Sequence, residues 1–401
     1  MTKSIADILI VGGGITGITL GLEIKRRFPD QSIIIIDKEK DCGLHASSRN
    51  SGVLHAGFYY TADSLKAQLT SKGNQLLQEY CLNRKLDLNQ CGKLVVASNE
   101  NELIVLDELI ARGKQNNVDL QLISAEEAKE IEPRVKTFQR AVFSPSTASV
   151  NPKQVMTRLI QEARDVGIGI HTDTQFLRTT NGHIYTNRGV YKTGYTINTA
   201  GLYADKIAHQ FGYAKNYRVL PFKGIYLHSN GPPNTLRTHV YPVPNPNNPF
   251  LGVHITVTVD QQYKIGPTAI PVLWREQYQG LDNFRWREFV EVVSTNIGLL
   301  LYNRFNFVQL AIGELKMYQQ NKLIEMANIL VDGVDSTKIN FCTKPGIRAQ
   351  LIDLNNRKLV MDFCYEGDDK SFHLLNAVSP AFTCALSLAE FCADKIEECV
   401  H

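Results

Sequence analysis

The sequence predicts an α/β protein (α+β overall), with one domain on a doubly wound parallel sheet and a discontinuous second domain on a mixed or antiparallel sheet. Three observations predict this fold. A strand, a glycine-rich turn, a helix and a second strand follow one another at the N-terminus, and strand–helix pairs recur near 195–211 and 374–398. Between 216 and 266, short strands alternate with loops rich in Pro and Asn. A chain of 401 residues is also too long for one ordinary hydrophobic core.

Composition narrows the classes of function. The formal net charge is +3 and basic residues are dispersed, which argues against a nucleic-acid partner. The eight cysteines form no C-x-x-C pair, which predicts free thiols in a reducing compartment and no metal site. We expect a cytoplasmic protein with no signal peptide and no membrane-spanning segment. The apolar stretch 292–312 is interrupted by Asn and Arg, so it fits amphipathic helices in a domain core, with a membrane-surface face as the alternative.

The N-terminal unit has the pattern of a dinucleotide-binding turn. Residues 7–11 are typical of a buried parallel strand, and residues 15–28 are expected to be helical. Between them, G-x-G-x-x-G falls on Gly12, Gly14 and Gly17. These glycines permit the tight turn, let a diphosphate approach the backbone, and let helix and strand pack closely. The backbone amides at the start of this helix would face the diphosphate.

A second strand, 32–36, ends at Asp37, twenty residues beyond Gly17. A carboxylate at this position can accept hydrogen bonds from a ribose. The full order of strand, turn, helix, strand and acid favours nucleotide binding over a plain glycine-rich turn in some other βαβ unit.

Three further segments favour FAD over NAD. The polar, small-residue segment 45–52 can follow a long cofactor away from the helix. Residues 195–201 predict a strand ending in Ala-Gly before a helix at 203–211, as in flavoproteins that cover the adenosine region this way. After a strand at 374–377, a helix is expected to open at Ser379 and run to about residue 398. Its positive end would stabilise a reduced flavin ring, although Ser379 and Pro380 also suit an ordinary capped helix.

Segments along nearly the whole chain resemble the D-amino-acid-oxidase-like superfamily of FAD oxidoreductases. Within it, the chain is most similar to the L-2-hydroxyglutarate dehydrogenase/oxidase family. The most selective segments are N-S-G-V-L-H-A-G at 50–57 and P-F-L-G-V-H at 249–254; others are 64–67, 91–97, 221–224, 241–244, 266–269 and 346–350. Two positions depart from the family pattern: Asp37 stands where Glu is more common, and 255–258 lack an arginine associated with the family.

The resemblance implies oxidation of L-2-hydroxyglutarate, or a similar 2-hydroxy acid, to the 2-oxo acid by hydride transfer to flavin N5. It implies that His254 is the base and that Arg348 holds a substrate carboxylate. Lys223 is expected either to hold the distal carboxylate or to lie near the flavin. Tyr60 and Tyr241 are expected to line the pocket. The alternative for His254 is a buried histidine bonded to the backbone, and for Arg348 and Lys223 it is a surface ion pair. Tyr60 and Tyr241 could instead be ordinary tyrosines of the core. The predicted cofactor-binding residues are Gly12, Gly14, Ile15, Thr16, Gly17, Asp37, Lys38, Ser47, Ser48, Asn50, Ser51, His55, Ala200, Gly201, Pro380, Ala381, Phe382 and Thr383.

Several features stay open at this point. His55 is expected beside the flavin, as in related enzymes, some of which attach the flavin covalently through a histidine here. The electron acceptor is a quinone or oxygen, and peripheral contact with the inner face of the membrane is open. An amino-acid, sarcosine-like or glycerol-3-phosphate oxidoreductase of the same fold is the alternative function, although a phosphate substrate needs more cations than Lys223 and Arg348. A flavin-binding protein without catalysis is the third reading.

The cofactor domain is expected to be discontinuous. We assign residues 1–85, 151–215 and 341–401 to an FAD-binding domain, and 86–150 and 216–340 to a substrate-binding domain. Within the second domain, strands are expected at 93–97, 219–228, 239–242, 252–259 and 262–266, and helix over 286–319.

Overall fold

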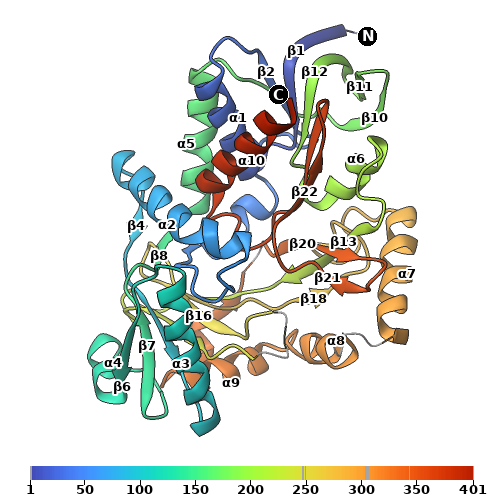
Figure 1. The fold of residues 1–401 in the computed structure, drawn as a ribbon. Helices are drawn as coiled ribbons and strands as arrows, with labels where there is room; N and C mark the ends of the chain where they lie inside the picture. The colour runs from blue at the N-terminus through green and yellow to red at the C-terminus, as the bar shows by residue number, and fades with distance from the viewer. Residues whose placement is uncertain (1, 246–247, 249, 303–306, 343, 401) are drawn as a thin grey trace. The chain divides into compact units, whose positions relative to one another are not determined.

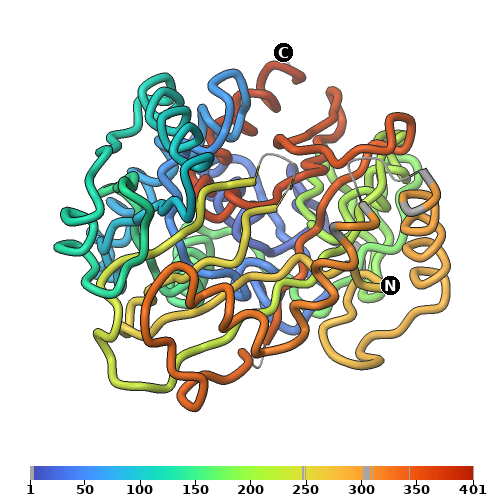
Figure 2. Tube along the Cα trace, turned by 90° about the horizontal axis from the view of Figure 1, so that it is seen from below, coloured from blue at the N-terminus to red at the C-terminus, as the bar shows by residue number. Residues whose placement is uncertain are grey.

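The computed structural model describes residues 2–245, 248, 250–302, 307–342 and 344–400. The chain forms two compact units. Unit 1 comprises Met1–Asn50, Pro152–Leu220 and Arg348–His401, and unit 2 comprises Ser51–Asn151 and Pro221–Ile347. The course of the chain through both units can be followed by colour in Figure 2.

The predicted domain bounds differ from these units in four places: residues 51–85, Asn151 and residues 341–347 cluster with unit 2, and residues 216–220 cluster with unit 1. The largest difference is the segment 51–85. Its strand β3 (Val53–Leu54) pairs with β8 (Ala148–Val150), and β8 pairs in turn with β4 (Leu88–Asn89). Helix α2 (Leu65–Asn83) packs on β3 and β4. The segment therefore completes a small sheet of unit 2.

Unit 1 is built on a parallel sheet. Its neighbouring strands run in the order β23, β12, β1, β2 and β9, and every pair among them is parallel. Strand β22 (Cys364–Gly367) adds an antiparallel edge beside β23. The parallel strands are β1 (Thr2–Val11), β2 (Ile33–Ile36), β9 (Gly169–His171), β12 (Gly189–Asn198) and β23 (Ser371–Asn376).

Helices cover one face of this sheet. Helix α1 (Ile15–Arg27) joins β1 to β2 and lies beside α5 (Pro152–Asp165) and α10 (Ala385–Val400), as Figure 1 shows. The predicted helix at 15–28 and the strands on either side of it are therefore confirmed. A Cβ on Gly21 would stand 3.2 Å from Ile35 Cδ1 and 3.3 Å from Ile10 Cδ1, so this small residue lets α1 approach the sheet.

The opposite face of the sheet carries a smaller layer. The first half of β12 continues into a meander with β11 (His183–Thr186) and β10 (Phe176–Thr180), while its second half pairs with β23. Helix α6 (Ala204–Gln210) follows β12 after a short 3-10 turn, η2 (Gly201–Tyr203). Leu9 and Val11 of β1 pack in one buried cluster with Ile207 of α6. The predicted strand, Ala-Gly and helix at 195–211 are confirmed in this part of the fold.

Unit 2 is built on an eight-stranded mixed sheet. The order is β19, β14, β17, β16, β15, β5, β7 and β6, with β15 and β5 parallel and the other neighbours antiparallel. These strands are β5 (Lys93–Val96), β6 (Gln121–Ser124), β7 (Arg140–Ser144), β14 (Leu227–Ser229), β15 (His239–Pro242), β16 (His254–Val257), β17 (Tyr263–Gly266) and β19 (Ile339–Phe341).

The two faces of this sheet have different cores. Leu94, Val240 and Ile255 point to one face, where the apolar side of α9 (Gln320–Leu330) and Ala128 of α4 (Ala125–Ile131) cover them. Successive side chains of a strand alternate between faces, so Val95 points to the other side. There it packs with residues of α3 (Glu100–Gln115) and with Phe58.

One predicted strand is divided in two. Residues 219–228 form the end of β13 (Tyr217–Gly224) and most of β14, because Ile225 N–H donates to the Thr268 hydroxyl instead of continuing a ladder. The expected helix at 286–319 is found as α7 (Trp286–Tyr302) and α8 (Phe307–Lys316), while residues 303–306 lie outside the described residues. Within the described chain, no helix combines the length and apolar character needed to cross a bilayer. The remaining strands are β18 (Ile270–Pro271), β20 (Gly346–Asp353) and β21 (Lys358–Leu359). Strand β18 pairs with β13, and β20 pairs with β21.

Candidate active site

The glycine turn of unit 1 has the close contacts that its spacing predicts. Gly12 has a φ of 112°, and a Cβ there would stand 2.6 Å from the carbonyl oxygen of Thr199. A Cβ on Gly17 would stand only 2.0 Å from Gly12 O, so no larger residue fits where α1 crosses the turn. Gly14 caps α1 without a side-chain hydrogen bond, and the described first turn of α1 contains no acidic residue. The helix itself therefore places no carboxylate against its own positive end, which suits a bound diphosphate.

Asp37 lies at the end of β2 and binds the turn itself. One carboxylate oxygen accepts a hydrogen bond from Gly13 N–H at 2.7 Å, and the other accepts from Glu39 N–H at 2.9 Å. Burial raises the pKa of Asp37, and these two backbone donors oppose that effect. Each carboxylate oxygen has further lone pairs, so the predicted ribose hydrogen bonds remain chemically available.

Lys38 lies beside this acid but is engaged locally. Its ammonium pairs with Glu39, and it stands 5.5 Å from the centroid of the Tyr203 ring. His45 Nε2 lies 2.9 Å from the same Glu39 carboxylate. Hydrogen bonds from His45 and Lys38 lower the pKa of Glu39 to about 2. The cluster fixes the start of the segment that leads away from β2.

Ser47 connects this segment to the glycine turn. Its hydroxyl oxygen accepts from Ile15 N–H at 2.9 Å, so one amide of the α1 N-terminus already has a protein partner. Ser47 and Ser48 belong to a 3-10 turn, η1 (Ala46–Ser48), which Asn50 holds by donating from Nδ2 to Ser47 O at 3.0 Å. The sequence thus brings these predicted residues together with the start of α1.

On the neighbouring strand, Thr199 lies between β12 and the predicted Ala200-Gly201 pair. Its N–H donates to Val11 O at 2.9 Å and its hydroxyl donates to Gly12 O at 3.1 Å. Ala200 N–H donates to the side chain of Asn198 at 3.2 Å. The Ala-Gly pair is therefore held against the Gly12 turn, as the nucleotide-binding interpretation requires.

The predicted helix start at Ser379 was wrong, because α10 begins at Ala385. Residues 379–384 form successive turns instead. Ala381 N–H donates to Val378 O at 2.9 Å and Cys384 N–H to Pro380 O at 3.1 Å, a mixed pattern that does not yet repeat as a helix. Ser379 is exposed and is not the N-cap, whereas Pro380, Ala381 and Thr383 are buried. The predicted contact of 380–383 with a flavin thus belongs to a turn and not to a helix N-terminus.

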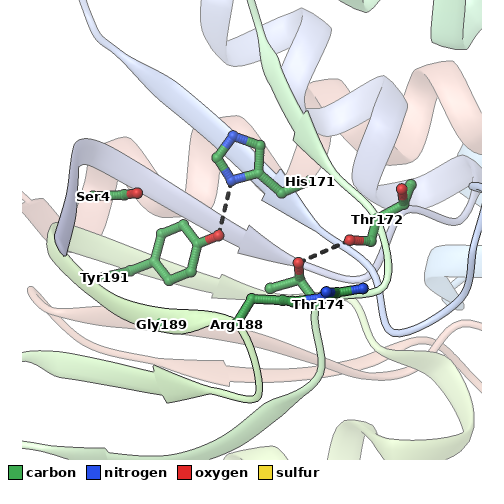
Figure 3. Close-up of a pocket in the computed structure, with 7 residues that line it drawn as sticks. All are labelled: Ser4, His171, Thr172, Thr174, Arg188, Gly189 and Tyr191. Atoms are coloured by element: carbon green, nitrogen blue, oxygen red, sulfur yellow. Dashed lines mark hydrogen bonds between the residues drawn. The ribbon is translucent and has the colours of Figure 1, made fainter. Parts of the chain in front are cut away.

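A separate pocket of about 340 Å³ opens within unit 1 (Figure 3). His171 Nδ1 lies 2.8 Å from the Tyr191 hydroxyl, and Thr174 donates from its hydroxyl to Thr172 O at 2.9 Å. Arg188 lies at the edge of the group in Figure 3. The residues that line it include none of the predicted site residues, so it is distinct from the glycine turn.

Unit 2 carries the predicted base. His254 begins β16 and is 5% exposed. Its Nδ1 lies 2.7 Å from the carbonyl oxygen of Gly252. A carbonyl only accepts hydrogen bonds, so Nδ1 carries the proton and the lone pair of the neutral ring lies on Nε2. His254 is thus bonded to the backbone through Nδ1, as the alternative expected. The same bond fixes the tautomer in which Nε2 can act as a base.

Tyr241 stacks on this imidazole. The two ring centroids are 3.8 Å apart and the planes differ by 20°. Tyr241 lies on the central strand β15, between β16 and β5, and is fully buried. Burial raises the pKa of its phenol well above the ordinary value. The buried Tyr241 ring therefore packs face to face against His254 and restricts the orientation of the imidazole.

The two predicted cations occupy different units. Lys223, on β13, belongs to unit 2 and is 7% exposed; its Nζ lies 3.5 Å from Tyr278 O and 5.4 Å from the centroid of the Tyr318 ring. Arg348, on β20, is half-buried and is the first residue of the last segment of unit 1. Neither is a freely exposed surface residue.

The remaining candidates belong to the N-terminal part of unit 2. Ser51 accepts from Val53 N–H at 3.3 Å. His55 is half-buried and follows β3. Tyr60 is also half-buried; its carbonyl accepts from Asn116 at 2.9 Å, and the ammonium of Lys66 stands 5.6 Å from its ring centroid.

Sequence reasoning missed two buried polar residues of the His254 cluster. Lys93 and His239 are both 0% exposed, and the register of β5 with β15 places them opposite each other. His239 Nδ1 accepts from Val257 N–H at 2.9 Å, and burial lowers its pKa to about 3, so the ring stays neutral. The available signal was alternation: Lys93 shares the strand face of the buried Val95, where a lysine is unusual.

Comparisons with known proteins agree with this geometry. Residues 7–309 match the family of FAD dependent oxidoreductases described as DAO. The chain is 34% identical to the mitochondrial L-2-hydroxyglutarate dehydrogenase of Nematostella vectensis over 98% of this chain and 90% of that protein. It is 33% identical to the human mitochondrial L-2-hydroxyglutarate dehydrogenase (98% and 89% covered) and 29% identical to the L-2-hydroxyglutarate dehydrogenase of Escherichia coli K12 (98% and 93%).

Solved structures share the fold. L-α-glycerophosphate oxidase of Mycoplasma pneumoniae, solved with FAD bound, has a TM-score of 0.78 at 21% identity, covering 99% of this chain and 95% of that one. Glycine oxidase of Geobacillus kaustophilus has a TM-score of 0.74 at 19% identity, with 98% and 95% covered. These likenesses confirm the predicted fold class, and the nucleotide-binding turn of unit 1 fits the cofactor. The chain belongs to the DAO family of FAD-dependent oxidoreductases.

Proposed function

We propose that this protein oxidises L-2-hydroxyglutarate to 2-oxoglutarate, with unit 1 as the FAD-binding domain and unit 2 supplying the base. The observation that carries the proposal is His254, whose Nδ1–H···O=C bond to Gly252 leaves the lone pair on Nε2. The relatives named above as L-2-hydroxyglutarate dehydrogenases, similar over 98% of the chain, support this substrate.

The reaction divides into a proton transfer and a hydride transfer. The glycine turn of unit 1 would hold FAD, which when bound would supply the acceptor for the hydride at C2 of the substrate. His254 Nε2 takes the hydroxyl proton, so the C2–O bond becomes a carbonyl and the product is the 2-oxo acid. A positioned base of this kind contributes about 10²–10⁴-fold to the rate.

Two cations match the two carboxylates of a 2-hydroxydicarboxylate. Arg348 would bind the carboxylate next to the reacting carbon, since its planar guanidinium can donate two parallel hydrogen bonds. Lys223 would hold the distal carboxylate as a point charge. Its burial makes it more effective than an exposed lysine, because a low-dielectric environment strengthens charge pairing. Tyr60 would complete the pocket wall, whereas Tyr241 is fully buried and would support the His254 ring.

Anaerobic reduction tests the substrate assignment. The purified holoenzyme is titrated with L-2-hydroxyglutarate, D-2-hydroxyglutarate, glycine, sarcosine and L-glycerol 3-phosphate, and the visible flavin band is followed. Bleaching by L-2-hydroxyglutarate alone is expected, with release of 2-oxoglutarate. Bleaching by an amine or by the phosphate instead would assign the alternative oxidoreductase function, and bound FAD that no substrate reduces would indicate a protein without catalysis.

As an FAD-dependent oxidoreductase, the protein must pass its electrons to an acceptor, and a membrane quinone is the acceptor we propose. One side of α7 exposes Trp286, Val290, Ile297 and Leu301, whose spacing places them within one helical stripe. Trp286 is 67% exposed and Leu301 77%. An apolar stripe with a tryptophan at one end is typical of helices that lie in a membrane interface.

Vesicle binding tests this contact. The holoenzyme is expected to sediment with anionic phospholipid vesicles, and the double variant Trp286→Ser/Leu301→Ser to remain in the supernatant. The matched control, Ile104→Ser on the exposed side of α3, should bind as wild type does. Equal binding by all three proteins would overturn the membrane contact. Hydrogen peroxide formed in proportion to substrate oxidised, without stimulation by a short-chain quinone, would identify oxygen as the acceptor.

A further inference from the structure

Lys93 is buried in an aromatic cage. Its Nζ lies 4.4 Å from the ring centroid of Phe58, 4.5 Å from that of Tyr59 and 4.9 Å from that of Tyr241. The side chain is 0% exposed. Within the described part of the chain, Nζ has no hydrogen-bond partner. Burying a charged lysine here costs free energy, because cation–π contacts replace its hydration only in part.

The sheet places this lysine behind the proposed base. Strand β15, which carries Tyr241, lies between β16 with His254 and β5 with Lys93. Tyr241 is paired with His254 across the sheet, and Lys93 is on the opposite neighbouring strand on the same face. The Tyr241 ring therefore has the imidazole on one side, at 3.8 Å, and the lysine on the other.

We propose, on the basis of the proposed function, that Lys93 is a positioning residue for His254: it holds the Tyr241 ring in place and keeps the imidazole in the neutral form that accepts the substrate proton. The physical basis is charge repulsion across the ring. At an effective dielectric constant of about 20, two unit charges on opposite sides of one aromatic ring interact strongly enough to move a titration by about one pH unit. A proton on Lys93 thus disfavours a second proton on His254.

Lys93 is suited to become protonated near neutral pH. Burial lowers its pKa to about 7. As the pH falls, Lys93 binds a proton inside its cage of ring faces, and its charge then opposes formation of the imidazolium. His254 consequently remains a base at a lower pH than it would beside a neutral side chain.

The other titratable groups around the cage do not change charge in this range. Burial raises the pKa values of Tyr59 and Tyr241, raises that of Cys91 to about 12 and lowers that of His239 to about 3. Two further basic residues lie on flanking elements: Arg112 of α3, which donates to Tyr59 O at 2.8 Å, and Lys66 of α2, beside the Tyr60 ring. The phenols of Tyr60 and Tyr226 complete the set.

The test is the pH dependence of kcat/KM with the substrate that bleaches the wild-type flavin. In Lys93→Met, which keeps the length and removes the charge, the acidic limb of the profile should move up by about one pH unit, while kcat/KM on the alkaline plateau stays within a few-fold of wild type. In Lys93→Arg, which keeps a charge, the limb should lie at or below that of wild type. The control Lys322→Met removes an exposed cation of α9 that pairs with Glu325, and its profile should match wild type.

The outcomes separate this inference from the proposed function. If L-2-hydroxyglutarate fails to reduce the wild-type flavin, the proposed function fails before any variant is compared. If wild type is reduced but Lys93→Met shows an unshifted acidic limb, Lys93 has only a packing role and the inference is overturned. If Lys93→Met does not retain FAD, Lys93→Gln repeats the comparison with a shorter neutral side chain, and an unshifted limb there is equally decisive.

Discussion

The carbonyl oxygen of Gly12 lies only 2.0 Å from the position that a Cβ on Gly17 would occupy. The first turn of α1 therefore packs directly on the glycine turn, and Gly17→Ala must push the two apart. We expect a loss of about 1–3 kcal/mol in the free energy of unfolding, as for other overpacked sites. Bound FAD should fall as well, because the turn that faces the diphosphate moves.

Gly298→Ala in α7 is the matched control, since nothing lies within 4 Å of the added Cβ. Alanine is favoured over glycine in a helix, so this variant should be as stable as wild type or up to about 1 kcal/mol more stable. Denaturant unfolding and the ratio of flavin to protein absorbance measure both effects. Equal stability of the Gly17 and Gly298 variants would contradict the close packing.

His254→Asn should keep FAD but lose turnover. Asparagine can still donate to Gly252 O, but it has no basic nitrogen in place of Nε2. We expect kcat/KM to fall by about 10²–10⁴-fold, with FAD content unchanged. Single-turnover flavin reduction distinguishes a slower chemical step from slower reoxidation. A variant that reduces its flavin at the wild-type rate would remove His254 from the mechanism.

Arg348→Lys should weaken substrate binding more than chemistry. Lysine keeps the charge but cannot donate two parallel hydrogen bonds to one carboxylate. A lost hydrogen bond to a charged group is worth about 1.5–3 kcal/mol, so KM should rise by about 10- to 100-fold. Steady-state kinetics with the 2-hydroxy acid measures this. A KM like that of wild type would place the carboxylate elsewhere.

His239 makes the stability of the protein depend on pH. Its pKa is about 3 in the folded chain, against 6.5 for an ordinary histidine. Between these values the unfolded chain binds more protons, so the contribution of His239 to stability is complete above pH 6.5 and falls as the pH drops toward 3. The slope from this residue is about 1.4 kcal/mol per pH unit. Burial lowers the pKa of Lys93 from 10.5 to about 7, so its contribution to stability falls in a separate window, as the pH drops from 10.5 to about 7.

Denaturant unfolding of wild type and His239→Gln, compared between pH 7 and 5, measures the histidine contribution. The variant should be less stable at pH 7, because a buried hydrogen bond from Val257 N–H is altered. It should also lose stability less steeply as the pH falls. Parallel curves would show that His239 is not buried in its neutral form.

The N-terminal unit could be predicted in detail because its signals are local. The glycine spacing, the apolar run before it and Asp37 after the second strand all lie within one stretch of chain, and the structure keeps them together. What could not be predicted was that Asp37 holds Gly13 N–H. That contact depends on how far the turn reaches toward the end of β2, which residue spacing does not specify.

Other features depended on contacts between distant segments. Residues 51–85 follow the nucleotide unit in sequence, but β3 pairs with β8, almost a hundred residues later, and this pairing assigns them to unit 2. The start of α10 was misplaced because Ser379 and Pro380 suit a helix cap in sequence, whereas the turns at 379–384 form first. Lys93 was visible only as a conspicuous lysine in an apolar strand. Its relation to His254 required the order β16, β15, β5, which joins three separate segments.

We propose that His254 and bound FAD together oxidise the C2–H bond of L-2-hydroxyglutarate. Anaerobic stopped-flow reduction with substrate deuterated at C2 tests it most directly. We predict complete flavin bleaching by one equivalent of substrate, a reduction rate several-fold slower with the deuterated compound, and one equivalent of 2-oxoglutarate. Flavin that stays oxidised under these conditions, or a reduction rate that is the same for both isotopes, would contradict the account.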